Sequence, residues 1–175
     1  MQIVIPEFVV DSIIKSATKR PFATLPGYME RSWFIPPTKY LPFDCRLHHI
    51  LRSDLDRHLH DHPWDYTTII LRGGYWEELF EDETRKTTKL TWHGPGSILQ
   101  REARSMHRLR LPEVLNPDLT SRTQTAWTLF FMGQKKQDWG FWDEDLGKRY
   151  WKEYLYNMAG SEEAPDPDYI PQLSY

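Results

Sequence analysis

The sequence predicts a mainly β protein, a single barrel or sandwich with helices confined to its two ends. Three observations support this fold class. Short apolar segments rich in β-branched and aromatic residues recur through the middle of the chain, turn residues separate them, and helical spacing occurs only near the termini. The 175 residues suffice for one hydrophobic core, so we expect one domain over residues 1–175.

A short helix is expected first, because residues 7–18 carry apolar side chains at mostly helical spacing. Five prolines then interrupt the chain between residues 21 and 42. Proline lacks a backbone donor and disfavours regular structure around it. Residues 20–44 are therefore expected to form loops with at most one short strand, at residues 31–35.

The barrel core is expected at about residues 45–133. Within it, β-branched and aromatic segments bounded by turn residues predict strands, and a polar stretch predicts a loop at residues 112–124. The expected strands are residues 46–52, 66–71, 75–80, 87–92, 97–101, 106–111 and 126–132.

The region after the barrel, residues 134–175, changes character. Apolar residues at close to a 3-4 repeat predict a C-terminal helix over residues 144–158. The acidic, proline-containing stretch at residues 160–175 is expected to be an extended arm.

Composition excludes several classes of function. The net charge of −3 and the mixed charge pattern predict no nucleic-acid partner. No stretch approaches the 18 apolar residues of a membrane span, so no membrane partner is expected. The single cysteine, Cys45, excludes an intrachain disulfide and fits a reducing compartment. Residues 1–6 do not resemble a signal peptide, so a cytoplasmic location is expected.

Three histidines, His58, His60 and His62, alternate within five residues. In an extended strand such residues share one face. Three imidazoles on one face are hard to explain as packing, whereas neutral imidazole is a good ligand for zinc, iron, copper and nickel. The pattern therefore predicts metal ligands.

A further histidine, His107, alternates with Leu109 and Leu111 and should share their inward face. It is either a buried structural residue or a third ligand that joins His60 and His62. Of the others, His49 is expected to be buried and structural, and His48 and His93 are expected to be solvated.

The spacing of these histidines resembles the cupin superfamily. In the first cupin motif, His-x-His is followed by a glutamate and then a glycine, and here His60, His62, Tyr66 and Gly73 stand at those positions. In the second motif a glycine and Pro-x-Gly precede a histidine. Gly96 and His107 match in spacing, although Pro-x-Gly is absent. His-Asp-His-Pro-Trp at residues 60–64, with Gly-Gly-Tyr, Trp-Thr-Leu and Trp-Gly-Phe further on, resembles short single-domain cupins of bacteria and their viruses.

The resemblance implies a cupin-type jelly-roll β-barrel with a short N-terminal helix and a C-terminal helical extension. It also implies one divalent metal ion on His60, His62 and His107, with Fe(II) favoured and Zn, Ni or Mn as alternatives. The expected function is a dioxygenase or hydroxylase that acts on a small molecule. Cupins often pair through sheet edges and terminal arms, so a homodimer that uses residues 160–175 is a further expectation.

Because Tyr66 replaces the glutamate of the motif, its phenol is a candidate catalytic proton donor. Asp61 or Asp65 could supply a carboxylate ligand if the strand bulges, and otherwise Asp61 is expected to orient an imidazole from the second shell. His58 is expected at the barrel mouth.

Four residues are candidates for contacts with substrate. Trp64 and Thr68 are expected to face the interior, and Arg101 or Arg104 could offer a guanidinium to a carboxylate or phosphate if it turned inward; the alternative is a solvated rim. Two other functions stay open: a metal-dependent isomerase or epimerase, with Tyr66 or His58 as proton carrier, and a non-catalytic binding protein.

Overall fold

A computed structural model of the chain describes residues 1–54, 58–117 and 119–158. The expected arm at residues 160–175, and with it the expected cover of a partner copy, lies outside these residues. The helices and strands are α1 (Glu7–Ala17), β1 (Pro21–Leu25), β2 (Met29–Ile35), β3 (Asp44–Ile50), β4 (Trp64–Arg72), β5 (Tyr75–Phe80), β6 (Thr88–His93), β7 (Ile98–Arg101), β8 (His107–Arg110), β9 (Glu113–Leu115), β10 (Ser121–Thr123), β11 (Ala126–Lys135), β12 (Gly140–Asp143), β13 (Gly147–Tyr150) and α2 (Trp151–Met158).

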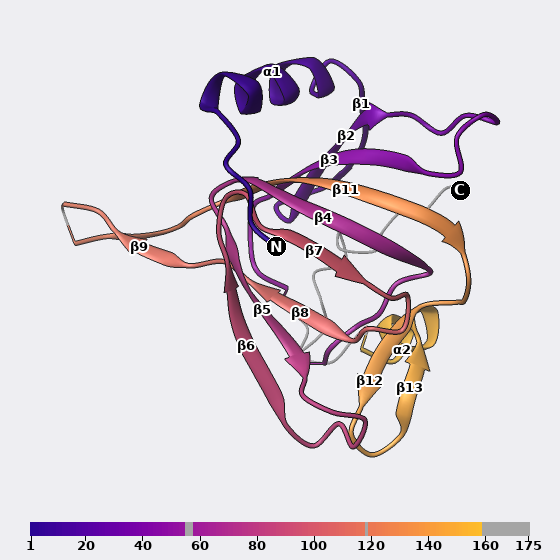
Figure 1. Ribbon diagram of the computed structural model, residues 1–175. Coiled ribbons are helices and arrows are strands. Elements are labelled where there is room, and N and C mark those ends of the chain that lie inside the picture. The colour runs from indigo at the N-terminus through magenta and orange to yellow at the C-terminus, as the bar shows by residue number, and fades with distance from the viewer. Residues whose placement is uncertain (55–57, 118, 159–175) are drawn as a thin grey trace.

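Two antiparallel sheets face each other across the interior of the barrel (Figure 1). The larger sheet has the order β1-β2-β3-β11-β4-β7, and the smaller has the order β6-β5-β8. An isolated bridge joins His60 to His107 of β8, and another joins His60 to Phe141 of β12. The smaller sheet is thus extended through His60 to the β12–β13 hairpin.

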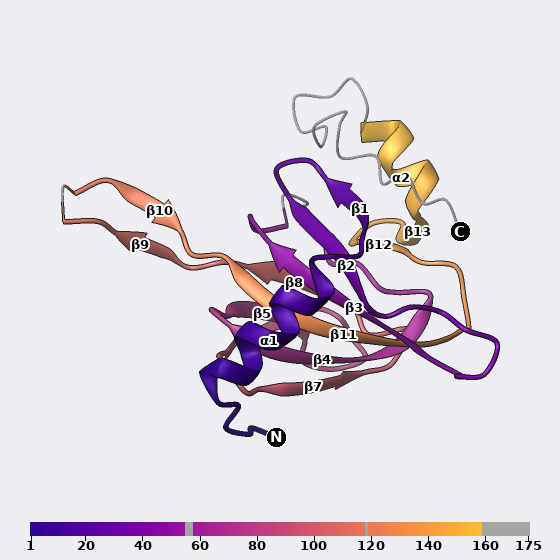
Figure 2. The same ribbon diagram turned by 90° about the horizontal axis from the view of Figure 1, so that it is seen from above.

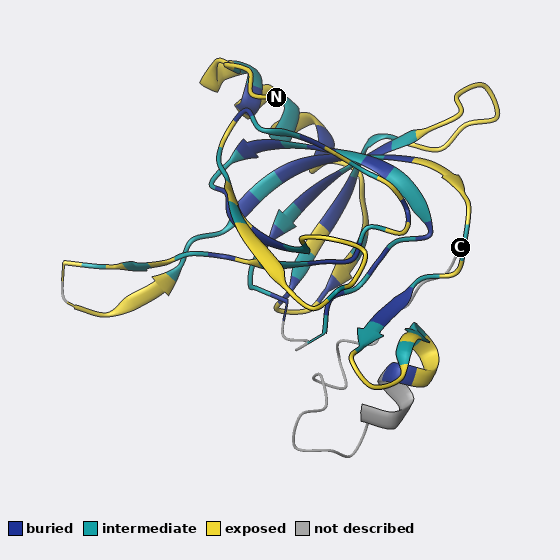
Figure 3. Cartoon of the chain, turned by 60° about the horizontal axis from the view of Figure 1, so that its bottom comes forward, coloured by how far each residue is buried: buried dark blue, intermediate teal, exposed yellow. Residues whose placement is uncertain are grey.

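The larger sheet packs on both of its faces, because strand alternation sends successive side chains to opposite faces. Its outer face packs under α1, which lies across the strands in the view from above (Figure 2). That cluster is apolar and consists of Val10, Ala17, Cys45, Leu47, Leu71 and Leu129. The inner face points into the barrel, where buried positions concentrate along the strands (Figure 3).

The mainly β architecture with a short N-terminal helix confirms the expected fold class, and the seven expected core strands are all present. None of the helices in the described residues has the length and apolar composition needed to cross a membrane.

Two strand pairs were not expected. β1 forms in the proline-rich stretch because it is the edge strand of its sheet, where Pro21 can occupy the first position without losing a ladder bond. β9 and β10 form a hairpin in the expected polar loop, held by the bonds of Asn116 to Thr120. Both views show this hairpin projecting from the barrel (Figures 1 and 2), so no burial pattern marks it in the sequence.

The helix expected over residues 144–158 is wrong in its first half. β12 and β13 pair as a hairpin, and α2 begins only at Trp151. The Asp143 carboxylate accepts the backbone N–H groups of Asp145 and Leu146, and Gly147 has a φ of +75°. An Asp that bonds the following backbone together with a left-handed glycine specifies a turn, which overrides the apolar spacing.

The alternation expected of His58, His60 and His62 holds only in part. Only His60 forms β-bridges, so the segment is extended but is not a regular strand.

Gly73 follows the last residue of β4 and starts the turn into the facing sheet, with a φ of +73°. A Cβ atom there would lie 2.1 Å from the Thr125 carbonyl oxygen, whereas a Cβ atom at Gly147, with a φ of +75°, meets nothing within 4 Å. We expect Gly147→Ala to lower the free energy of unfolding by about 1 kcal/mol, the cost of the left-handed conformation alone. Gly73→Ala should cost about 3 kcal/mol or more, because the backbone must also move. Urea denaturation of both variants measures this, and equal losses would contradict the close approach.

Candidate metal centre

His60, His62 and His107 come together at one end of the interior. His60 and His62 lie on the extended segment just before β4, and His107 is the first residue of β8. The backbone N–H of His60 donates to the carbonyl of His107 at 2.9 Å, and the N–H of His107 donates back at 2.8 Å. This reciprocal pair fixes two of the three histidines directly opposite each other.

The three imidazoles fit a single metal ion. One ligand nitrogen from each lies within 4.8 Å of the others, and the Nε2 atoms of His62 and His107 are 2.8 Å apart. Two nitrogens bound to one ion at about 2.1 Å are about 3 Å apart, so this pair needs almost no movement to accept it. Among the described residues, these three make up the one cluster of His, Cys, Asp or Glu with such spacing.

The environment keeps the imidazoles of His60 and His62 neutral. Burial lowers the pKa of His60 from 6.5 to about 4. Burial also lowers the pKa of His62, and the neighbouring His107 and His60 lower it further. A metal ligand must offer a lone pair, so histidines that resist protonation are suited to the role.

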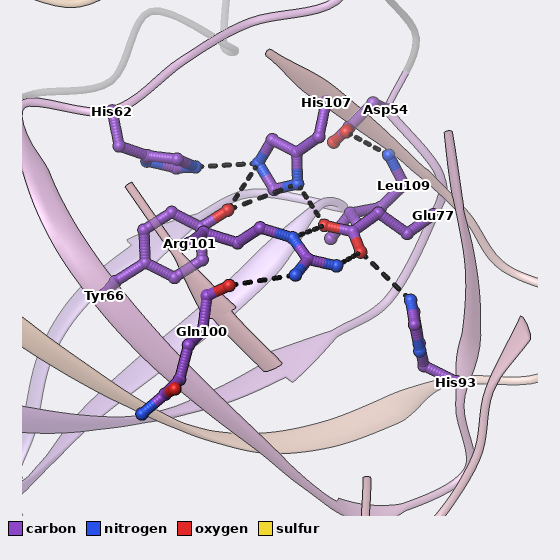
Figure 4. Close-up of polar contacts among 9 residues, drawn as sticks. All are labelled: Asp54, His62, Tyr66, Glu77, His93, Gln100, Arg101, His107 and Leu109. Atoms are coloured by element: carbon purple, nitrogen blue, oxygen red, sulfur yellow. Dashed lines mark hydrogen bonds and ion pairs between the residues drawn. The ribbon is translucent and has the colours of Figure 1, made fainter. Parts of the chain in front are cut away.

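A buried carboxylate, Glu77 of β5, supports the cluster (Figure 4). His107 donates from Nδ1 to Glu77 Oε1 at 3.0 Å, His93 donates to Oε2 at 3.0 Å, and Arg101 donates to both oxygens. Burial opposes ionisation of Glu77, but these hydrogen bonds outweigh it and hold its pKa well below the usual range. The bond to Nδ1 fixes the His107 tautomer and leaves Nε2 for the metal.

Sequence reasoning missed Glu77 and misplaced His93. A signal for Glu77 was present, because Glu77 alternates with Tyr75 and shares its inward face. An acidic residue at a core-facing strand position requires partners. His93 is the last residue of β6, not a solvated turn residue, and its side chain is only 12% exposed.

Three of the other predicted residues line the cavity: Trp64, Tyr66 and Thr68. The Tyr66 hydroxyl lies 3.4 Å and 3.3 Å from the two ring nitrogens of His107. Burial raises the pKa of Tyr66 well above 10, and Glu77 raises it further. Tyr66 therefore keeps its proton at neutral pH.

The two aspartates do not serve the imidazoles. The buried Asp61 carboxylate accepts hydrogen bonds from the backbone N–H of Gly140 and from the side-chain amide of Gln137, each at 2.8 Å. It also forms an ion pair with Lys148 at 2.6 Å. It therefore anchors the C-terminal hairpin, which corrects the expectation that it orients an imidazole.

Asp65 faces the other way, accepting the Ala103 N–H at 2.9 Å and pairing with Lys136 at 2.5 Å. The β4–β11 register does shift beside Asp65, between the Tyr66–Met132 and Trp64–Lys135 pairs, but the Asp65 carboxylate is not part of the histidine cluster. His58 is also separate from the cluster, since its Nδ1 lies 3.0 Å from the Tyr154 hydroxyl.

Neither predicted arginine is available to a substrate in this arrangement. Arg101 is committed to Glu77. Arg104 is 80% exposed beside Glu102, as a solvated rim residue would be.

The three histidines open onto a cavity of about 160 Å³ between the two sheets. Its walls include Phe130 and Thr128 of β11 and His48 of β3. His48 is only 8% exposed, so the expectation that it is solvated is wrong. Its strand is buried on both faces, which alternation alone does not reveal.

Comparison with known proteins places the fold. The polyketide cyclase RemF from Streptomyces resistomycificus is similar over 97% of this chain and 96% of its own, with 14% identity and a TM-score of 0.52. A cupin-2 domain protein from Rhodospirillum rubrum has 12% identity and a TM-score of 0.49, with 78% of each chain covered. No protein-family model and no curated protein matches the sequence.

Hydroxypropylphosphonic acid epoxidase from S. wedmorenis has 13% identity and a TM-score of 0.48. The match covers 66% of this chain but only 56% of the epoxidase, so this chain spans little more than half of that protein. At such identities the likeness concerns the fold alone. The chain has the cupin fold that the histidine spacing led us to expect.

Glu77→Gln should weaken binding of a divalent metal ion about 10- to 100-fold, because the amide is a poorer acceptor for His107 Nδ1. Glu78→Gln is a matched control. Glu78 is the next residue of β5, and it binds Arg108 and Arg110 instead of a histidine. Titration with zinc and a competing chelator gives both affinities. An unchanged affinity in Glu77→Gln would contradict the supporting role.

Stability of the metal-free protein should rise with pH between about 4 and 6.5. The folded pKa of His60 is about 4 and the ordinary value is 6.5, so in this window the unfolded chain binds more protons and acid favours unfolding. His60 alone should contribute up to about 3 kcal/mol across the window. Urea denaturation at several pH values measures the slope. His60→Asn should reduce the slope but not abolish it, because the pKa values of His62 and His48 are also lowered, and His58→Ala should preserve it. A wild-type slope that survives in His60→Asn would refute this origin.

Proposed function

We propose that this cupin-fold protein binds one divalent metal ion through His60, His62 and His107 and oxidises a small molecule held in the adjoining cavity. The reaction class we favour is a dioxygenase or hydroxylase with Fe(II). The observation that carries the proposal is the convergence of three imidazoles at the wall of a cavity. Zn, Ni and Mn are the alternative ions.

The ligand set suits chemistry at a metal better than a purely structural role. Three neutral nitrogens leave coordination positions open, and a structural zinc site is normally closed by four protein ligands. Tyr66, in place of the carboxylate, adds no negative charge. The bound ion would supply a strong Lewis acid, and with Fe(II) a centre for activation of O₂.

The protein's own groups would orient the reactants. Glu77 holds the ring of His107 in place, and the Tyr66 hydroxyl beside that ring can donate a hydrogen bond to a bound ligand. Phe130 packs against Tyr66 with ring centroids 4.7 Å apart and gives the cavity an apolar wall beside His62.

An isomerase or epimerase is the second candidate, because Tyr66 places a phenol at the site. Burial raises the pKa of Tyr66, so the phenol is a poor base at neutral pH. This favours the oxidative reading. Turnover under strict anaerobiosis would instead support the isomerase, and ligand binding without turnover would support a binding protein.

The metal assignment can be tested with two histidine variants of the same segment. His62→Ala should lose at least about 100-fold in metal affinity, since it removes one of three ligands. His58→Ala should retain wild-type affinity because His58 contacts Tyr154. Isothermal titration with Zn(II) and anaerobic titration with Fe(II) give the values. Equal metal affinity in His62→Ala and the wild type would contradict the proposal.

The open coordination positions can be tested with nitric oxide. The Fe(II)-loaded wild-type protein should bind it and give an electron paramagnetic resonance signal, because three protein ligands leave sites for a small molecule. His58→Ala should give the same signal. A metal-loaded protein that never binds nitric oxide would argue for a closed structural site and against the oxygenase.

A further inference from the structure

The cavity has a second polar region, formed by basic residues of β2 and β3. Arg31 of β2 is the register partner of His48 of β3, and Arg46 precedes His48 by two residues on the same face. All three line the cavity, and none belongs to the candidate metal centre. We call Arg31, Arg46 and His48 the basic wall.

Two residues of the basic wall are buried with polar atoms that bond nothing. Arg31 and His48 are each 8% exposed. Arg31 Nε and His48 Nε2 have no hydrogen-bond partner in the described part of the chain, and neither has Nε1 of Trp64, which lines the same cavity. No carboxylate of the described residues pairs with Arg31. A buried charge without a partner is costly, so a protein that keeps one usually has a use for it.

Aromatic rings hold the guanidinium groups in place. The Phe22 ring centroid lies 5.1 Å from the guanidinium carbon of Arg31 and 4.9 Å from that of Arg46. Arg46 also lies 5.1 Å from Trp33 and 5.7 Å from Trp64. Cation–π contacts offset part of the cost of burial. They leave Arg31 Nε, which bonds nothing among the described residues, available to an anion.

Asp44 and His48 limit the positive charge of the basic wall. Asp44 interacts with Arg46, and burial raises the pKa of Asp44 against the opposing effect of that arginine. Burial lowers the pKa of His48, and Arg31 and Arg46 lower it further, so His48 is neutral.

The basic wall and the metal centre are adjacent in the cavity. The Phe130 ring contacts both, with centroids 5.0 Å from His48 and 5.8 Å from His62. A ligand that lay along this ring would reach from one region to the other. The cavity, about 160 Å³, is comparable to engineered cavities of about 150 Å³ that hold benzene.

We propose that the basic wall binds the carboxylate of a small organic acid and directs the rest of that molecule along Phe130 toward the three histidines. The assignment of this acid as the substrate rests on the proposed function. Binding of the carboxylate depends only on the basic wall, so it can be measured in the metal-free protein.

The test compares matched ligands by isothermal titration against the full chain, both metal-free and zinc-loaded. Benzoate and butanoate supply the carboxylate, benzamide is the neutral analogue of benzoate, and phenyl phosphate supplies a dianion. Benzoate or butanoate should bind, and benzamide should bind at least about 10-fold more weakly than benzoate, since charge-assisted bonds are lost.

Arg31→Met is the central variant, because it removes the charge while keeping a long apolar side chain. It should weaken carboxylate binding about 10- to 100-fold and leave zinc affinity unchanged. Without ligand, its unfolding midpoint in urea should equal or exceed that of the wild type, since an unpaired buried charge is gone. Arg104→Met, at an exposed position, controls for net charge and should bind carboxylate as the wild type does.

Several outcomes would overturn the proposal. These are failure of both carboxylates to bind, benzamide binding as tightly as benzoate, and Arg31→Met binding carboxylate normally. A destabilised Arg31→Met would show a structural role for that arginine, and tighter binding of phenyl phosphate would replace the carboxylate by a phosphate ester. If the wild-type protein bound carboxylate but not zinc, the metal proposal would be refuted and the carboxylate proposal would stand.

Discussion

The reciprocal backbone hydrogen bonds between His60 and His107 are the constraint on which the rest of the molecule depends. They join the segment before β4 to the first residue of β8 and thereby connect the two motifs that carry the histidines. The same residue, His60, also bridges to Phe141 of the C-terminal hairpin. Because backbone geometry sets this pairing, the relative position of the ligands is determined before any metal arrives. Such preorganisation reduces the entropy lost on binding.

The interior contains two clusters of polar residues that differ in how their hydrogen bonds are satisfied. Around Glu77, one buried carboxylate is met by Arg101, His93 and His107, so the protein satisfies its own charge. Around Arg31 and His48, nitrogen atoms are buried without partners among the residues that the structure describes. A protein seldom leaves buried donors unsatisfied by accident. The contrast suggests that the first group completes the scaffold and that the second awaits a molecule from outside.

The sequence predicted those features that depend on local pattern. The alternation of His60 with His62, and of His107 with Leu109, predicted that these three histidines lie together, because it fixes the face that a side chain shares. The C-terminal hairpin was missed because the apolar spacing of residues 144–158 fits a helix, while the decisive information lies in a turn at Asp143 and Gly147. Spacing could place Glu77 on an inward face but could not identify its partners, and the roles of Arg31 and His48 also depend on which strands lie side by side.

The buried carboxylate of Asp61 also has a consequence for how the chain can be shortened. It accepts a hydrogen bond from Gly140 and pairs with Lys148, both in the C-terminal hairpin. Its own neighbours in the sequence are His60 and His62. Removal of the residues after β11 would leave that charge without these two partners next to the site, and would strip a bridging partner from His60. The hairpin is therefore no dispensable appendage, and a minimal engineered barrel has to retain it.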